Sequence, residues 1–190
     1  MAQGDFFIIS GASGSGKTTI VTRLVAERRS ATRFITMTTR PPRPGEVDGV
    51  DYHFVTRTTF EGCIARGEML EWAEVYGNLY GSSRTHLVEL RATHDVVFSI
   101  VDVQGAKTLS GLIPDAVSVF LTAPFDQIER RLTERPASSP AELEKRLAAA
   151  ARENELAETF DHVVSSADGE IESTLAKVRS IVQRERAAQL

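Results

Sequence analysis

Residues 11–18 constrain the fold of this chain more than any other stretch of its sequence. They read Gly-Ala-Ser-Gly-Ser-Gly-Lys-Thr, which fits the pattern G-x-x-x-x-G-K-[ST]. The apolar residues 5–10 before them predict a short buried strand, and Ile20, Val21 and Leu24 recur at helical spacing after them. A chance glycine-rich turn is the alternative, and the strand and helix speak against it. The motif therefore predicts a loop that binds the phosphates of a nucleoside triphosphate.

Each kind of residue in this loop has a physical role. The glycines permit positive φ angles and close approach, and successive backbone N–H groups, with the positive end of the following helix, form an anion cradle. Lys17 is placed to reach the β- and γ-phosphates, and the Thr18 hydroxyl to bind Mg²⁺. The predicted triphosphate-binding residues are Gly11, Ala12, Ser13, Gly14, Ser15, Gly16, Lys17, Thr18 and Thr19.

Composition predicts a single globular domain over residues 1–190, with 42% hydrophobic and 25% charged residues. The net charge of -4 argues against a protein that coats nucleic acid, and no apolar run is long enough to cross a bilayer. The N-terminus lacks the basic region of a signal peptide, so we expect a cytoplasmic protein. The single Cys63 excludes an internal disulfide and is expected in the core, on a helix. The histidines lack metal-site spacing and are expected to be structural or surface residues: His53, His86, His94 and His162.

Predicted strands alternate with predicted helices, which is typical of an α/β fold with a parallel sheet and helices on both faces. The expected strands are residues 5–10, 33–38, 52–55, 70–75, 96–103, 116–122 and 161–165. The expected helices are residues 17–29, 83–93, 104–112, 125–134, 139–157 and 169–187, with another from a capping box at 58–61 to Gly67. Three prolines and two glycines predict a loop over residues 40–51, and residues 77–81 are expected to form a turn.

A second group of residues predicts another phosphate site. Arg40 and Arg43 stand three apart on the proline-stiffened loop, and guanidinium groups suit bidentate binding of phosphate. Tyr52 adds a hydroxyl donor. A solvated basic turn is the alternative for two arginines taken by themselves.

At this point the chain resembles the guanylate kinases. Thr38 to Phe54 fit the GMP-binding signature of that family at every fixed position, residues 70–82 are similar to its guanine-recognition block, and residues 102–106 resemble the block after its central strand. The resemblance covers nearly the whole chain in order. It implies a P-loop NTPase-type fold with a five-stranded parallel core (residues 1–37, 93–132 and 151–190), a GMP-binding insertion (38–92) and a lid (133–150).

The resemblance also implies an activity, its substrates and its cofactor. The γ-phosphoryl group of Mg·ATP would pass to GMP or dGMP, with Mg²⁺ as the metal and no nucleic-acid or membrane partner. The oligomeric state, monomer or homo-oligomer, stays undecided. The residues that match the family's GMP site are Thr36, Arg40, Arg43, Tyr52, Glu71, Tyr80, Ser82 and Asp102.

The chemistry of Glu71 and Ser82 fits guanine independently of the resemblance. A carboxylate can accept from both N1–H and the 2-amino group, and a hydroxyl can donate to O6. Adenine offers an acceptor at N1 and no 2-amino group, so such a site discriminates by about 10⁴-fold or more. The neighbouring Trp72 is expected to pack in the core. A surface charge at a strand edge is the alternative for Glu71.

The predicted catalytic residues are Lys17, Arg40, Arg131, Arg135 and Arg146. The last three match the arginines of the family's lid, where positive charge would stabilise the transferring phosphoryl group. Salt-bridged surface arginines are the alternative, which we prefer for Arg130.

Three departures from the family pattern bear on activity. Ile100 replaces the first of two acids at the end of the central strand, which places the rate in doubt. Ser166 replaces an Asn near the adenine site, and Arg135-Pro-Ala replaces Arg-Gly-Thr in the lid. A non-catalytic guanylate-kinase-like binding module is one alternative, opposed by the intact Lys17 and Thr18. A small kinase acting on a ribose phosphate is another, opposed by the base-reading pair.

Overall fold

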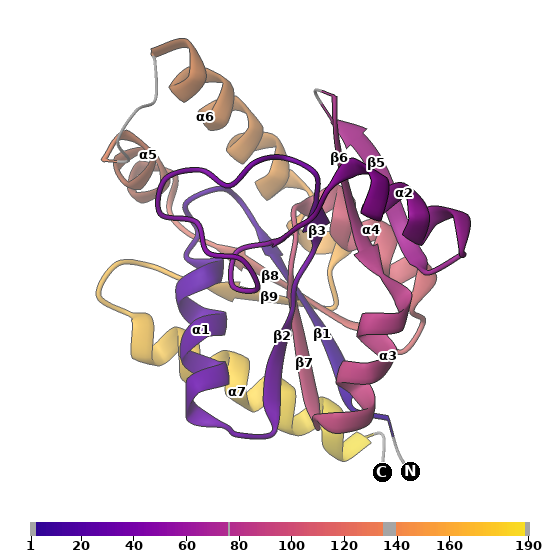
Figure 1. Cartoon of the computed structure of the whole chain (residues 1–190). Coiled ribbons are helices and arrows are strands. Elements are labelled where there is room, and N and C mark those ends of the chain that lie inside the picture. Colours follow the sequence, from indigo (N-terminus) through magenta and orange to yellow (C-terminus); the bar gives the residue numbers. More distant parts are fainter. Residues whose placement is uncertain (1–2, 76, 135–139, 189–190) are drawn as a thin grey trace.

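The computed structural model describes residues 3–75, 77–134 and 140–188 (Figure 1). Its first half contains β1 (Asp5–Gly11), α1 (Lys17–Glu27), β2 (Ala31–Phe34), β3 (Met37–Thr38), β4 (His53–Phe54), α2 (Arg57–Ala65), β5 (Met69–Val75), β6 (Asn78–Ser83) and α3 (Arg84–Thr93). Its second half contains β7 (Val96–Ile100), α4 (Val103–Leu112), β8 (Val117–Thr122), α5 (Phe125–Thr133), α6 (Pro140–Glu155), a 3₁₀ turn (Ala157–Thr159), β9 (His162–Ser165) and α7 (Ile171–Ala188).

The main sheet has five strands in the order β2-β7-β1-β8-β9, and every neighbouring pair is parallel. This confirms the predicted five-stranded parallel sheet. The central strand β1 places Ile9 beside Ile100 of β7 on one side and beside Val119 of β8 on the other. The loop that follows β1 therefore emerges at the carboxyl edge of the sheet, where open α/β sheets bind ligands.

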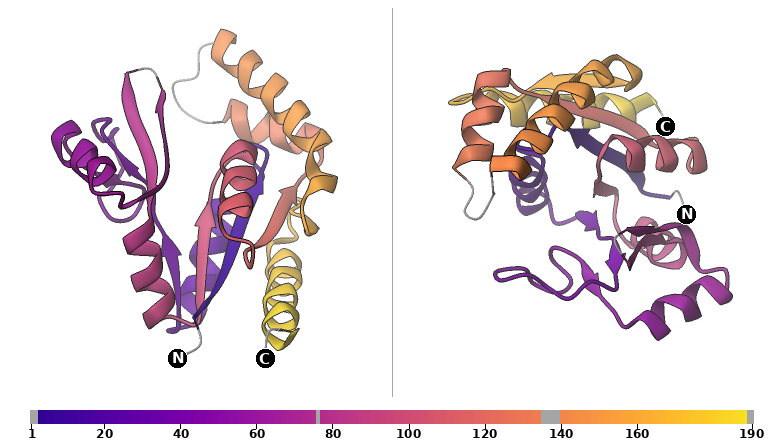
Figure 2. Two further views of the ribbon diagram at one scale, coloured as in Figure 1. Left: turned by 90° about the vertical axis from the view of Figure 1, so that its right-hand side faces the viewer. Right: turned by 90° about the horizontal axis from the view of Figure 1, so that it is seen from above.

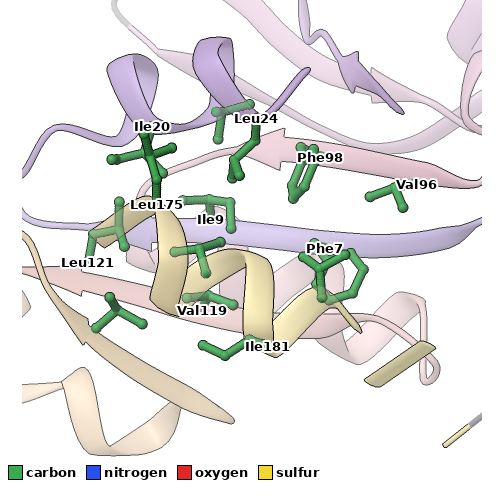
Figure 3. Close-up of a cluster of buried hydrophobic side chains, with 14 of the residues drawn as sticks. Phe7, Ile9, Ile20, Leu24, Val96, Phe98, Val119, Leu121, Leu175 and Ile181 are labelled. Carbon is green, nitrogen blue, oxygen red and sulfur yellow. The ribbon is translucent and has the colours of Figure 1, made fainter. Parts of the chain in front are cut away.

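Helices cover both faces of this sheet, as predicted. Phe7 and Ile9 of β1 point to one face, where they pack with Leu24 of α1 and Leu175 of α7 (Figure 3). The alternate residues of β1 point to the opposite face and pack with Leu87 of α3 and with residues of α4. Because both faces are buried, β1 is apolar without alternation from Phe6 to Ile9.

A second sheet of four strands has the order β4-β3-β6-β5. β5 and β6 form an antiparallel hairpin, and β3 pairs with β6. Phe60 and Cys63 of α2 are buried against this sheet, so Cys63 is a core residue in a helix as predicted. The second sheet and α2 stand on one side of the carboxyl edge of the main sheet, and α5 and α6 stand on the other (Figures 1 and 2).

The structure corrects the prediction of one strand over residues 33–38. β2 ends at Phe34 and belongs to the main sheet, whereas β3 begins at Met37 and belongs to the second sheet. Between them the Thr36 carbonyl accepts a hydrogen bond from the backbone N–H of His53 (2.9 Å). The chain passes from one sheet to the other at this point.

Residues 77–81 were predicted as a turn, but Asn78–Ser83 form β6. Leu79 is buried in the second core, and Gly81 lies opposite Trp72 in the hairpin. A Cβ atom on Gly81 would lie 2.6 Å from the Glu71 carbonyl oxygen, so the glycine permits close strand packing. Gly81 is therefore needed for the close packing of β5 and β6, and not for a turn.

The predicted ends of three elements and one burial assignment also change. α2 is capped by Thr56, whose Oγ1 accepts from the Thr59 N–H (3.1 Å), and not by Thr58. β7 stops at Ile100, and Asp102 caps α4 instead of lying in the strand. Trp72 was predicted in the core but is 49% exposed.

None of the described helices combines the length and the apolar character needed to cross a membrane.

Candidate active site

The loop between β1 and α1 depends on its glycines. Gly11, Gly14 and Gly16 all have positive φ angles, of 142°, 86° and 90°. A Cβ atom on Gly11 would lie 2.1 Å from the Leu121 carbonyl oxygen, so no other residue fits there. The backbone N–H of Ser15 donates to the Ala12 carbonyl (3.0 Å), which closes the loop on itself.

The N-terminus of α1 presents uncapped backbone donors to this loop. Gly16 occupies the N-cap position and has no side chain with which to cap the first turn. Thr18 and Thr19 are exposed in that turn. The N–H groups at the positive end of an eleven-residue helix are suited to binding phosphate oxygens.

Lys17 lies against the loop that it follows. Its Nζ donates to the carbonyl oxygens of Gly11 (2.7 Å) and Ala12 (3.0 Å). The ammonium group is therefore held at the loop, where bound phosphates would gather.

Arg131 of α5 joins the loop to the segment after β9. Its guanidinium donates to the Gly14 carbonyl (2.9 Å), the Ser166 carbonyl (3.1 Å) and Asp168 Oδ1 (2.7 Å). Arg131 lowers the pKa of Asp168 by this hydrogen bond, which keeps the carboxylate charged. Arg130 pairs with Asp168 and Glu134 at the surface, as predicted.

A pocket of about 350 Å³ opens beside these contacts. It is lined by Gly16, Thr19, Ile20, Arg131, Ser166 and Ile171, among others. The buried Ser166 Oγ lies 3.3 Å from where a Cβ of Gly16 would be, so the pocket reaches the first turn of α1. Its position next to the loop suits the nucleoside part of a triphosphate.

Ile100, which stands where the family has an acid, is the last residue of β7. Ile100 is partly buried and packs against the apolar cluster of the main sheet. Asp102 is exposed two residues later, and its Oδ1 accepts the backbone N–H of Gly105 (2.7 Å) as the cap of α4. One acid therefore remains near the loop at this strand end.

The predicted second phosphate site gathers on the second sheet and its long loop. Arg40 pairs with Glu46 (2.9 Å) and lies over the ring of Tyr52, with its Cζ 5.5 Å from the ring centroid. Tyr80 of β6 faces the Tyr52 ring (6.2 Å between centroids). Arg40, Tyr52 and Tyr80 are thus brought together from three segments, as their predicted shared role requires.

Burial and neighbouring charges shift the pKa values of two residues in this cluster, Tyr52 and Glu46. Burial raises the pKa of Tyr52, so its hydroxyl stays protonated and able to donate a hydrogen bond. Arg40 lowers the pKa of Glu46 through their hydrogen bond. Glu46 also accepts from the backbone N–H of Arg43 (2.7 Å), so this carboxylate holds the loop in shape. The sequence reasoning missed Glu46, although opposite charges six residues apart on a stiff loop were a signal.

Glu71 and Ser82 are direct partners in the β5–β6 hairpin. Residues opposite each other in antiparallel strands project to the same face, so a carboxylate and a hydroxyl stand side by side. Ser82 is buried, and Glu71 is half-buried. This arrangement matches the predicted base-reading pair.

The remaining predicted residues are placed as follows. The side chain of Arg43 is exposed, and Thr36 lies at the crossing between the sheets. Arg146 is half-buried on α6. Arg135 lies outside the described residues. The predicted site residues also did not include Glu153 of α6, whose carboxylate interacts electrostatically with Lys17.

Comparisons with known proteins agree with this geometry. A family model of guanylate kinases matches residues 3–185. The chain is 44% identical over 184 residues to a guanylate kinase of Thiobacillus denitrificans, covering 95% of this chain and 88% of that protein. It is 42% identical over 191 residues to a guanylate kinase of Neisseria gonorrhoeae, covering 99% and 93%. The crystal structure of guanylate kinase from Anaplasma phagocytophilum superposes with a TM-score of 0.71 at 28% identity, covering 97% of this chain and 87% of that one. The chain therefore belongs to the guanylate kinase family.

Proposed function

We propose that this chain transfers the γ-phosphoryl group of Mg·ATP to GMP or dGMP, giving ADP and GDP or dGDP. Family membership makes GMP the acceptor, and the donor, the metal and the residue roles are the proposal. The observation that carries it is the pairing of two sites: an uncapped, glycine-shaped phosphate loop with Lys17, and a second sheet that presents Glu71 beside Ser82. A GMP kinase needs both.

The donor site is assigned to residues 11–19, with the adenosine in the pocket beside Arg131. The acceptor site is assigned to Thr36, Arg40, Arg43, Tyr52, Glu71, Tyr80, Ser82 and Asp102. The corresponding division of the chain is a core (1–37, 93–132 and 151–190), a GMP-binding part (38–92) and a lid (133–150).

The residues near Thr18 fit a magnesium ion held mainly by substrate. The described chain offers no group of three metal-ligating side chains, and Mg²⁺ in kinases keeps waters and substrate phosphates as ligands. The exposed Thr18 hydroxyl, next to Lys17 at the start of α1, would supply the protein ligand. A bound ion would supply positive charge to offset the negative charge of the donor phosphates.

The acceptor is already a phosphate oxyanion, so the chain needs no general base. Its residues act by holding the two phosphates in line and by neutralising charge. Arg40 would hold the GMP phosphate, and Lys17, Arg131, Arg135 and Arg146 would surround the transferring group. Exclusion of water by the lid would prevent hydrolysis of ATP.

A coupled ADP-release assay with Mg·ATP tests the proposal, with GMP, dGMP, AMP, CMP and UMP as acceptors. Turnover is expected with GMP and dGMP only. Absence of turnover, with GMP still bound by calorimetry, would instead indicate a binding module or an impaired kinase, and the same assay on Ile100→Asp would separate these two. The predictions of a cytoplasmic location and of no nucleic-acid partner rest on the sequence alone.

A further inference from the structure

We propose that Glu153 of α6 is a positioning residue for phosphoryl transfer, which holds Lys17 and the phosphate loop in register with the helix that carries Arg146. The inference rests on the proposed function and assigns a role to a residue that the mechanism above does not use. Glu153 acts through Lys17 and the loop rather than by touching a substrate.

The first support is the docking of α6 on the phosphate loop. Ala150 of α6 is fully buried in a cluster with Ala12 of the loop, and Leu143 and Leu147 pack against the same cluster. Arg146, Ala150 and Glu153 are spaced at i, i+4 and i+7, which places them on one face of a helix. One face of α6 therefore carries a predicted phosphate-binding arginine, the contact with the loop, and the carboxylate.

The second support is the surroundings of the carboxylate. Its Oε2 atom is buried and has no hydrogen-bond partner among the described residues. Burial raises the pKa of Glu153, while Lys17 and the backbone N–H of Ser13 favour the charged form, and Asp102 opposes it. The carboxylate thus lies close enough to the phosphate loop to interact with Lys17 and with the backbone N–H of Ser13.

This arrangement is unfavourable for stability, which argues for a role in the reaction. A buried carboxylate oxygen without a partner costs free energy, and a neutral or apolar side chain would fill the same space at lower cost. Groups of this kind are concentrated at functional sites. A residue present only to pack α6 would not need the charge.

In this proposal the charged carboxylate attracts the Lys17 ammonium across the loop. Two of the ammonium protons are directed at the carbonyl oxygens of Gly11 and Ala12. The negative charge of Glu153 keeps the Lys17 ammonium at the edge of the loop before the triphosphate binds. Binding then costs less conformational entropy. Since Glu153 belongs to α6, the same contact couples the position of Arg146 to that of Lys17.

The substitution Glu153→Gln tests this role, because the amide keeps the size and one acceptor but removes the charge. The value of kcat/KM for Mg·ATP should fall by roughly 10- to 100-fold, the effect expected of a displacement of about 1 Å at a reacting group. The KM for GMP should change by less than about twofold, which is the error of additivity between uncoupled sites. The midpoint of thermal unfolding should stay equal or rise. Glu155→Gln, at an exposed position of the same helix, is the matched control and should change neither property.

A double-mutant cycle tests the path through Lys17. Glu153→Gln should weaken Mg·ATP binding, measured by calorimetry without GMP, in the parent protein, and should change it by less than about twofold in Lys17→Met. An equal loss in both backgrounds would overturn the inference, as would kinetics of Glu153→Gln that match those of Glu155→Gln. A parent protein that does not phosphorylate GMP would refute the proposed function instead, so the two failures are distinguishable.

Discussion

Among single residues, Glu71 is the one that we propose to select the base of the acceptor. Its cross-strand partner Ser82 is buried, so a base bound beside this pair would meet the Glu71 carboxylate where little water is present. In Glu71→Gln the side-chain NH₂ group would face the N1–H and 2-amino donors of guanine. If the amide turned, it would offer them only one oxygen acceptor. We expect kcat/KM for GMP to fall by about 10- to 100-fold, as for loss of one or two charge-assisted hydrogen bonds. Steady-state assays with varied GMP measure this.

Glu74→Gln provides the control for that substitution. Glu74 lies on the same strand and forms an exposed ion pair with Arg57, so its charge is removed without a change at the base. Its kinetics should equal those of the parent protein. An equal loss in both variants would show that the charge of the strand, and not recognition of guanine, is responsible.

A second residue-scale prediction concerns pH. Arg91 is buried, donates to the Gly4 carbonyl (2.7 Å) and pairs with Asp115, whose pKa it lowers from the ordinary value of 3.8. A depressed folded-state pKa gives stability that is present above pH 3.8 and is lost as the pH falls through the folded value. Asp115 is 52% exposed, so Asp115→Asn should cost at most about 1 kcal/mol at pH 7.

Urea unfolding at pH 7 and at pH 3 measures this difference. The difference in the free energy of unfolding between the parent protein and Asp115→Asn should be smaller at pH 3 than at pH 7, because the protonated acid resembles the amide. A gap that stays constant or widens at pH 3 would show that the ion pair is not its source.

At the scale of elements, the first turn of α2 gives a prediction that separates sequence from structure. Thr56 caps the helix through the Thr59 N–H, whereas Thr58 is an exposed residue inside it. Thr56→Ala should lower the free energy of unfolding by about 1 kcal/mol. Thr58→Ala should leave it unchanged or slightly higher, because alanine has the better helix propensity. Urea denaturation of both variants decides, and a larger loss in Thr58→Ala would restore the capping box as the true start.

The elements predicted well were those fixed by local pattern. β1, the phosphate loop and α1 follow from an apolar run, three glycines and helical spacing within 27 residues, and tertiary contacts only reinforce them. The prediction of one strand over residues 33–38 was wrong because β-branched residues favour a strand without indicating which sheet it joins. That choice is made by the contact of Thr36 with His53, seventeen residues further along the chain.

The environments of individual side chains were likewise predictable only where the local sequence fixes them. Arg131 could be predicted from its place in a recognisable pattern, but its partner Asp168 comes from a distant turn. The alternation in β5 gives the face to which Trp72 points, yet it does not say whether another layer covers that face. Glu153 and Glu155 look alike in sequence, and only the packing of α6 on the loop distinguishes the half-buried carboxylate from the exposed one.

On the scale of the whole molecule, the two sheets are joined where the chain crosses between them. It leaves the main sheet between β2 and β3 and returns where β6 runs directly into α3. The proposed base-reading pair, Glu71 and Ser82, lies on the second sheet and the phosphate loop on the main one, and the two units stand apart around the carboxyl edge (Figures 1 and 2). In-line transfer requires the two phosphates to meet, so the second sheet should turn toward the loop about these crossings.

A bisubstrate analogue, with guanosine and adenosine joined through five phosphates, tests this movement. It should bind more tightly than GMP or ATP alone, since the second site is filled as an intramolecular step. Small-angle scattering should show the radius of gyration falling toward about 16 Å, the value for a compact chain of this length. The analogue with adenosine at both ends lacks the donors that Glu71 accepts, and it should bind weakly and leave the scattering unchanged. Tight binding of the guanosine analogue without compaction would mean that the substrates meet in the arrangement seen here, and that the crossings between the sheets do not act as hinges.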